Sequence, residues 1–153
     1  MTEDSIKNRV QEEVKVAMRA QDKIRLSILR LILSEFKRIE VDERIVLDPV
    51  RELALLDKMQ KQRRDSIAQF TAAGRLELAE KEQQEIEIIQ AFMPASLDQA
   101  EIQKMVVAAI ETSQAKTMQD MAKVMAILKP ELQGRADMGA VSALVKTLLS
   151  GAS

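Results

Sequence analysis

The segment Met93-Pro94-Ala95-Ser96-Leu97-Asp98-Gln99 decides how this chain is organised. Proline has no backbone N–H and cannot continue a helix, so Pro94 ends the helical pattern that precedes it. Ser96 followed by Gln99 matches a capping box, the signature of a new helix start. The sequence therefore predicts two helical subdomains, an N-terminal one over residues 1–93 and a C-terminal one over residues 94–153.

Before this boundary, apolar residues recur at three- and four-residue steps, the period of an amphipathic helix. The pattern predicts four helices, over residues 5–20, 24–39, 49–74 and 75–92. Asp22 and Asp48 are suited to cap the second and third helices, and Gly74 to end the third. The second helix is apolar on two faces, so we expect it in the middle of its subdomain.

After the boundary, three short apolar stripes predict three helices, around residues 102–110, 118–128 and 141–149. Thr117 with Asp120 can cap the second of these helices, Pro130 is predicted to close it, and Asp137 can cap the third. Short connections between one-sided helices are typical of a compact bundle. The predicted fold is all-α, with long N-terminal helices followed by a C-terminal three-helix bundle.

The chain has no cysteine and no histidine. These absences exclude Cys and His metal ligands and every catalytic Ser-His or Cys-His pair. Only carboxylates and lysine remain as possible general acids or bases. Adjacent acids such as Glu12 and Glu13 point to different helix faces, and no glycine-rich nucleotide loop is present. We therefore expect no catalytic site, no metal and no cofactor.

The longest apolar run, residues 105–110, is far shorter than the roughly 20 residues that span a bilayer. Residues 1–5 are acidic and polar, unlike the basic and then apolar start of a signal peptide. The sequence thus predicts a soluble, cytoplasmic protein without membrane contact.

Basic residues form local clusters, although the formal net charge is only −1. Residues 15–38 hold seven basic and two acidic residues, a net charge of +5. Two further groups complete the candidate nucleic-acid-binding residues: Lys61, Arg63 and Arg64 in the third helix, beside Lys58, and Lys123, Lys129, Gly134, Arg135 and Lys146 in the C-terminal bundle. The turn at Gly134 leads into a helix N-terminus, where backbone N–H groups can meet a phosphate.

Each of these features has a plainer alternative. The basic clusters can be solvated faces that pair with the Glu-rich fourth helix. Residues 57–66 are polar except Met59, so we expect this stretch to project into solvent or to meet a partner. Met118, Met121 and Met125 have helical spacing, which favours core packing over an adaptable docking surface.

Three segments resemble the GatB/YqeY family and occur in its order. They are residues 25–31 (Arg-Leu-Ser-Ile-Leu-Arg-Leu), residues 61–94 from Lys-Gln-Arg-Arg-Asp-Ser-Ile to Met-Pro, and residues 123–137, which include Leu-Lys-Pro at 128–130 and Gly-Arg-Ala-Asp at 134–137. The match is similar to the stand-alone YqeY-like branch. One departure is Gly139-Ala140, where related sequences often place a basic residue.

The resemblance implies a relation to the C-terminal tail of GatB, a component of the glutamine-dependent aspartyl/glutamyl-tRNA amidotransferase, which is a carbon-nitrogen ligase with glutamine as amido-N-donor. That tail is understood to touch tRNA, while the chemistry occurs in a separate catalytic domain. The resemblance thus implies a tRNA-associated accessory protein that binds without catalysing. The alternatives are a docking module for an amidotransferase or aminoacyl-tRNA synthetase subunit and, least supported by the residues, an autonomous amide ligase.

Overall fold

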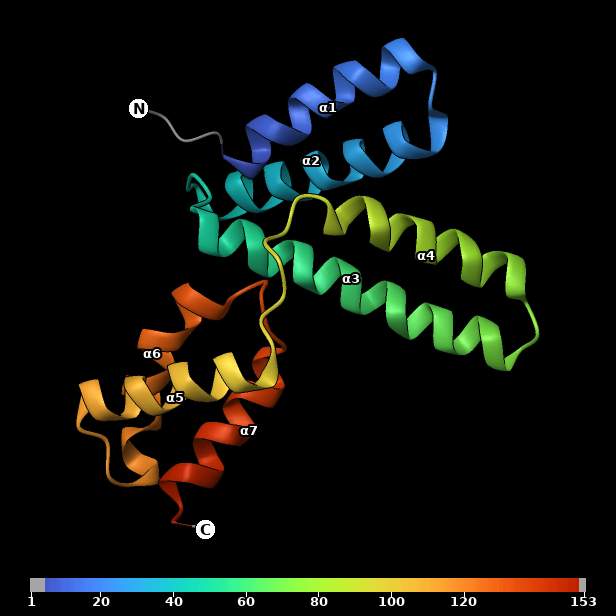
Figure 1. Cartoon of the computed structure of the whole chain (residues 1–153). Coiled ribbons are helices and arrows are strands. Elements are labelled where there is room, and N and C mark those ends of the chain that lie inside the picture. The colour runs from blue at the N-terminus through green and yellow to red at the C-terminus, as the bar shows by residue number, and fades with distance from the viewer. Residues whose placement is uncertain (1–4, 152–153) are drawn as a thin grey trace. The chain divides into compact units, whose positions relative to one another are not determined.

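The computed structural model describes residues 5–151, and within them it holds seven α-helices and no strand (Figure 1). The predicted all-α fold is confirmed. Residues 1–4, which carry most of the argument against a signal peptide, lie outside the described residues. The helices pack into two compact units, the N-terminal unit up to Met93 and the C-terminal unit from Pro94 onward.

The N-terminal unit consists of two helical hairpins (Figure 1). The first joins α1 (Ile6–Ala20) to α2 (Lys23–Glu43), and the second joins α3 (Pro49–Ala72) to α4 (Leu76–Gln90). Helix α2 packs against α1, α3 and α4, as its two apolar faces predict. Its fully buried side chains Leu29, Ile32 and Phe36 form the centre of the core.

The helix ends of the N-terminal unit follow the predicted local signals. The side chain of Asp22 accepts the N–H of Arg25 at 3.1 Å, and Asp48 caps α3 in the same way. At the end of α3, Gly74 has a φ of +74°. The Gly74 N–H donates to the Thr71 carbonyl and the next N–H to the Phe70 carbonyl, the two bonds of a Schellman motif, which needs a left-handed residue at this point.

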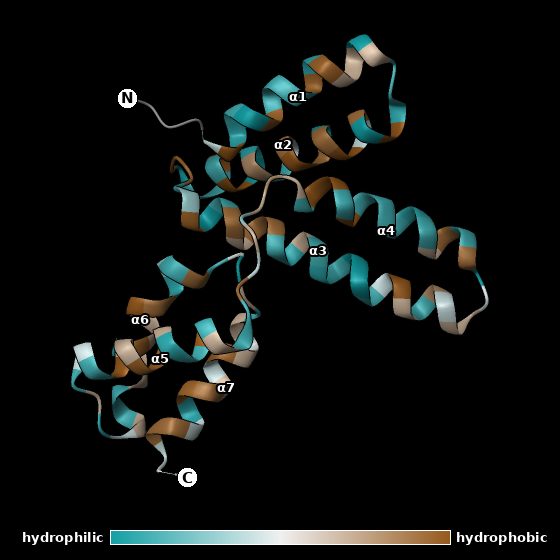
Figure 2. Ribbon diagram, in the orientation of Figure 1, coloured by the Kyte–Doolittle hydropathy of each residue, from teal (hydrophilic) through white to brown (hydrophobic). Residues whose placement is uncertain are grey.

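The polar middle of α3, teal in Figure 2, is exposed in part, as expected, and in part packs within its own unit. Gln60 is only 3% exposed, and its side-chain amide donates to the side chain of Gln90 at 2.9 Å. Met59 is buried as well. Helix α4 supplies hydrogen-bond partners for the polar side chains of this stretch. The stretch can therefore be half-buried against α4 although few of its residues are apolar.

The C-terminal unit contains α5 (Gln99–Ser113), a short 3-10 turn η1 (Met118–Asp120), α6 (Met121–Leu132) and α7 (Met138–Leu149). Its core is almost purely apolar: Val106, Val124, Leu128, Leu132 and Val145 are fully buried. The predicted core role of the methionines holds in part, since Met121 and Met125 pack against this core whereas Met118 is 39% exposed.

Two predicted helix ends in this unit are wrong. Helix α5 is capped by Asp98, whose carboxylate accepts the Glu101 N–H at 2.8 Å, and not by Ser96. Residue 97 instead donates its N–H to the carbonyl of Arg135, so the chain enters the helix two residues later. Pro130 does not close α6, which continues to Leu132. A proline in the last turn removes a single backbone bond, and the burial of Leu132 offsets that loss.

Candidate nucleic-acid interface

The basic residues of α3 divide into one structural arginine and an exposed set. Arg63 donates from Nε to Glu85 of α4 at 3.0 Å, and its side chain is only 11% exposed. Its guanidinium also donates to the carbonyl of Met59. Lys61 and Arg64 are exposed, and neither has an acidic partner among residues 5–151. Arg63 therefore fastens α3 to α4, whereas Lys61 and Arg64 remain open to a ligand.

The larger basic cluster, on α1 and α2, divides in the same way. Three of its seven basic side chains are ion-paired within the α1–α2 hairpin: Lys15 with Glu12, Arg25 with Glu13, and Arg38 with Glu35 and Asp42. Arg38 donates a hydrogen bond to the Glu35 carboxylate at 2.9 Å, and this bond raises the pKa of the Arg38 guanidinium. The other four are exposed and have no acidic partner within the described part of the chain: Arg19, Lys23, Arg30 and Lys37.

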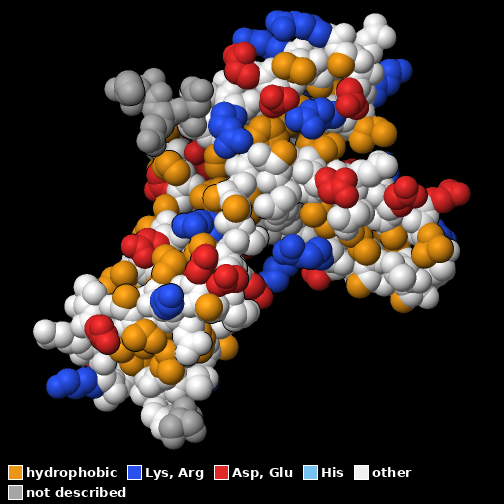
Figure 3. Space-filling view, viewed as in Figure 1, with side chains coloured by type: hydrophobic (Ala, Val, Ile, Leu, Met, Phe, Trp, Pro, Cys, Tyr) orange, Lys and Arg blue, Asp and Glu red, His pale blue; other side chains and the backbone are white. Residues whose placement is uncertain are grey.

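The Glu-rich helix α4 does not neutralise these clusters. Among the ion pairs of the described residues, only the one between Arg63 and Glu85 connects a basic cluster to α4. In the view of Figure 3, acidic side chains gather along α4, while basic and acidic ones are interspersed over the α1–α2 hairpin. Burial and the nearby charge of Glu85 raise the pKa of the Glu82 carboxyl. The N-terminal unit thus pairs part of its charge within the α1–α2 hairpin and leaves the exposed cations of both basic clusters without a partner on α4.

A groove between α2 and α3 holds one cation of the first basic cluster, Arg38, and two of the second, Lys58 and Arg63, of which only Lys58 has no acidic partner among the described residues. Its lining comes from Leu31, Glu35 and Arg38 of α2 and from Leu55, Lys58, Met59, Gln62 and Arg63 of α3. The groove has a volume of about 290 Å³. Arg38 and Lys58, which are 20 positions apart in the sequence, thus both line the groove, one from each helix. The apolar part of the lining includes Leu31, which is 39% exposed.

In the C-terminal unit, the turn before α7 is already satisfied by its own residues. Gly134 has a φ of +80°, which explains the glycine at this turn. The Asp137 carboxylate accepts the Gly139 N–H at 3.0 Å, and its charge stands at the α7 N-terminus, where a phosphate would bind. Arg135 is half-buried, and its carbonyl accepts the N–H of Leu97.

The three candidate lysines of this unit lie on two helices. Lys123 and Lys129 are exposed on α6, with Lys123 at 3.7 Å from Asp120. The Asp120 carboxylate accepts the backbone N–H groups of Lys116 and Thr117, as predicted for its capping role, and these bonds lower its pKa. Lys146 is in the last turn of α7, about 12 Å along the axis from the helix start.

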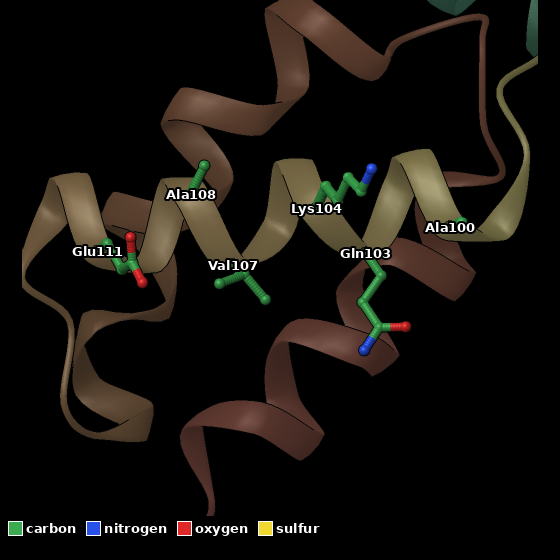
Figure 4. A pocket seen from close by; sticks show the side chains of 6 residues that line it. All are labelled: Ala100, Gln103, Lys104, Val107, Ala108 and Glu111. Atoms are coloured by element: carbon green, nitrogen blue, oxygen red, sulfur yellow. The ribbon is translucent and has the colours of Figure 1, made fainter.

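A shallow hollow on the outer side of α5 contains no constellation of catalytic groups. It is lined by Ala100, Gln103, Lys104, Val107, Ala108 and Glu111 (Figure 4). Lys104 and Glu111 are its only charged residues, and they lie two helical turns apart. Among the described residues, no group of three or more acidic side chains could hold a metal ion. Within the same range, every helix is too short or too polar to traverse a bilayer.

Sequence reasoning missed a buried carboxylate at Glu52, which is 1% exposed. One oxygen accepts the backbone N–H of Lys7 at 2.9 Å, so a residue of α3 caps the start of α1. Burial raises the pKa of this carboxyl. Nearby, the Lys7 ammonium donates to Glu40 at 3.1 Å, a bond that lowers the pKa of Glu40. The sequence contains one signal for this burial: Glu52 lies four residues before Leu56 and therefore on the apolar face of α3.

A model of the family described as Yqey-like protein matches residues 7–149. The match covers nearly the whole chain, so this chain belongs to the YqeY-like family.

Similar curated relatives are fungal proteins. The "Altered inheritance of mitochondria protein 41, mitochondrial" of Eremothecium gossypii is 38% identical over 89 residues, covering 56% of this chain and 48% of the relative. The protein of the same name from Candida glabrata is 36% identical over 86 residues, covering 55% and 47%. An uncharacterized protein of Schizosaccharomyces pombe is 35% identical over 78 residues, covering 51% and 63%. The chain spans about half the length of the first two relatives.

These names overturn the prediction of a cytoplasmic protein, because the relatives that carry them are named as mitochondrial. The prediction rested on an absence, the lack of a basic and apolar leader in the sequence. Such an absence does not determine a compartment.

Proposed function

We propose that this chain is an accessory protein that associates with tRNA through basic side chains of its N-terminal unit and binds without catalysing. The observation that carries the proposal is a set of exposed cations on α1, α2 and α3 that have no acidic partner among the described residues: Arg19, Lys23, Arg30, Lys37, Lys61 and Arg64. Phosphates are the ligands that such cations take in sequence-independent RNA contact. The likeness to the amidotransferase tail is the reason for choosing tRNA among RNAs.

Within this proposal the candidate residues have unequal roles. Lys61 and Arg64 contact phosphate, since both are exposed and unpaired among the described residues. Arg63 positions α3 and makes no contact with the RNA, because Glu85 already holds its guanidinium. In the C-terminal unit, Lys129 and Lys146 add weaker contacts, and Gly134 with Arg135 shapes the turn before α7.

The test is tRNA binding to the full chain, measured by fluorescence anisotropy across a salt series. Lys61→Glu combined with Arg64→Glu is expected to weaken binding about tenfold or more at low salt, because two phosphate contacts become repulsive. Lys104→Glu combined with Lys116→Glu makes the same charge change in the C-terminal unit and is expected to have little effect. Equal losses in both variants, or binding no tighter than that of an acidic control protein, would overturn the proposal.

A second candidate function is docking on an amidotransferase or aminoacyl-tRNA synthetase subunit. The observation in its favour is that α3 keeps an exposed polar row at Lys61, Gln62 and Asp65 beside its half-buried face. The test is binding of the chain to the purified subunit after nuclease treatment. Binding that persists, and that is weakened by Gln62→Ala combined with Asp65→Ala, would favour docking over RNA association.

A further inference from the structure

The solvent face of α2 carries a regular row of cations. Lys23, Arg30 and Lys37 follow one another at seven-residue intervals, and all three are exposed. Seven residues are almost two helical turns, so the side chains lie on one face about 10.5 Å apart and cover about 21 Å in total. Ser27 and Ser34 fill the positions between them. We call these three cations the α2 row.

The α2 row has no acidic side chain at helical reach that is free to neutralise it. The residues three and four positions from Arg30 are leucines and serines. Glu40 is three positions from Lys37, but its carboxylate already accepts bonds from the Lys7 ammonium and from the backbone N–H of Leu47. The serines add no charge. The row therefore presents three uncompensated positive charges on a rigid 21-residue helix.

We propose that the α2 row is a binding site for the phosphate backbone of duplex RNA. A duplex presents about one phosphate charge per 1.7 Å of its axis, so a straight row of cations meets phosphates without needing a particular base sequence. The row has no aromatic side chain, and Phe36 of the same helix is buried in the core. This favours backbone contact with a duplex over base stacking with a single strand.

An anionic membrane is the competing polyanion, and the composition of α2 speaks against it. A helix that lies on a membrane inserts an apolar face between the lipids. The apolar face of α2 is occupied by the core of its own unit, with Ile28, Leu29 and Ile32 nearly or fully buried. Serines separate the cations of the row, and the exposed apolar side chains of α2, Ile24, Leu31 and Val41, are too few to form a continuous inserting face.

This inference rests on the proposed function and assigns it a second surface, distinct from Lys61 and Arg64. The experiment measures binding of the full chain to a blunt-ended RNA duplex at several salt concentrations, for Arg30→Ala combined with Lys37→Ala. Removing two phosphate contacts is expected to reduce the slope of log affinity against log salt by about two. The matched control, Lys104→Ala combined with Lys116→Ala, is expected to leave the slope unchanged. Melting followed by circular dichroism verifies that each variant is folded.

The outcomes separate the two proposals. An unchanged slope in the α2 variant, with wild-type binding intact and still sensitive to the Lys61 and Arg64 reversals, overturns the α2 row and leaves the proposed function standing. Absence of salt-dependent RNA binding in the wild-type chain overturns both. Two other results overturn the assignment of the α2 row to duplex RNA. One is an equal change of slope in the α2 variant and its control, and the other is preferential binding of the wild type to phosphatidylserine vesicles.

Discussion

Each of the two units of this chain is stabilised internally by a different kind of contact. The C-terminal unit encloses a core of aliphatic side chains, with Gln133 its one buried polar residue among those described. The N-terminal unit has an aliphatic core around α2 but fastens its hairpins with polar groups: the Gln60–Gln90 bond, the Arg63–Glu85 pair and buried Glu52. Polar fastening makes the N-terminal unit sensitive to charge and pH, and this is the unit that carries most of the unpaired cations.

The largest expected effect is a cavity in the apolar C-terminal core. Leu128 is fully buried, so Leu128→Ala is expected to lower the free energy of unfolding by about 2–5 kcal/mol. Hydrogen exchange of the full chain should show the loss of protection concentrated in α5, α6 and α7. The neighbouring exposed substitution Lys129→Ala should change the free energy by less than about 0.5 kcal/mol. Equal effects of the two substitutions would contradict the assignment of this core.

The Arg63–Glu85 pair provides the corresponding break in the N-terminal unit. Arg63→Ala leaves Glu85 partly buried beside Glu82 without its cation, and is expected to cost about 3 kcal/mol, measured by urea unfolding. Arg63→Met combined with Glu85→Met removes both charges and should recover much of that loss. The exposed Arg64→Ala is the control. A cost no greater than that of the control would show that α3 and α4 do not depend on this pair.

Buried Glu52 gives the N-terminal unit a pH dependence of its own. Because its pKa is raised in the folded state, the native form binds the proton more readily, and its contribution to stability falls as pH rises from the unfolded pKa through the folded pKa. Glu52→Gln avoids the buried charge while its carbonyl can still accept the Lys7 N–H. We expect the variant to gain about 1 kcal/mol relative to wild type above that window, and less below it.

The measurement is the difference in urea midpoint between Glu52→Gln and wild type from about pH 4 to about pH 8. Glu80→Gln removes an exposed carboxylate from α4 and is the matched control. Glu40, whose pKa is lowered, contributes stability above its unfolded pKa in both proteins and loses it as pH falls, so it largely cancels in the difference. A difference that does not vary with pH would contradict the account of Glu52.

The smallest expected effect concerns the start of α5. Asp98→Ala removes the carboxylate that accepts the Glu101 N–H and is expected to cost about 1 kcal/mol, measured by thermal unfolding. Ser96→Ala should be nearly silent, because the cap is two residues further on. The reverse ranking would restore Ser96 as the cap and shift the start of the C-terminal bundle.

Features that depend on a few neighbouring residues were determined by the sequence itself. Asp22, Asp48 and Asp137 cap their helices as predicted, and Gly74 ends α3 with a positive φ. The interaction in each case closes within two to five residues, so the local signal suffices. The seven-residue spacing of Lys23, Arg30 and Lys37 is also present in the sequence alone. Ser96 and Pro130 misled because a long-range contact at residue 97 and the burial of Leu132 override the local preference.

Only the tertiary structure decided which charges are used inside the fold and which face outward. Arg63 and Arg64 are adjacent in the sequence and chemically identical, yet Arg63 pairs with Glu85, 22 positions away, and Arg64 is exposed. Glu52 caps a helix whose first residues precede it by 45 positions. The α2–α3 groove likewise depends on how two helices cross. The physical reason is that burial and pairing are properties of helix packing, which composition and local spacing do not contain.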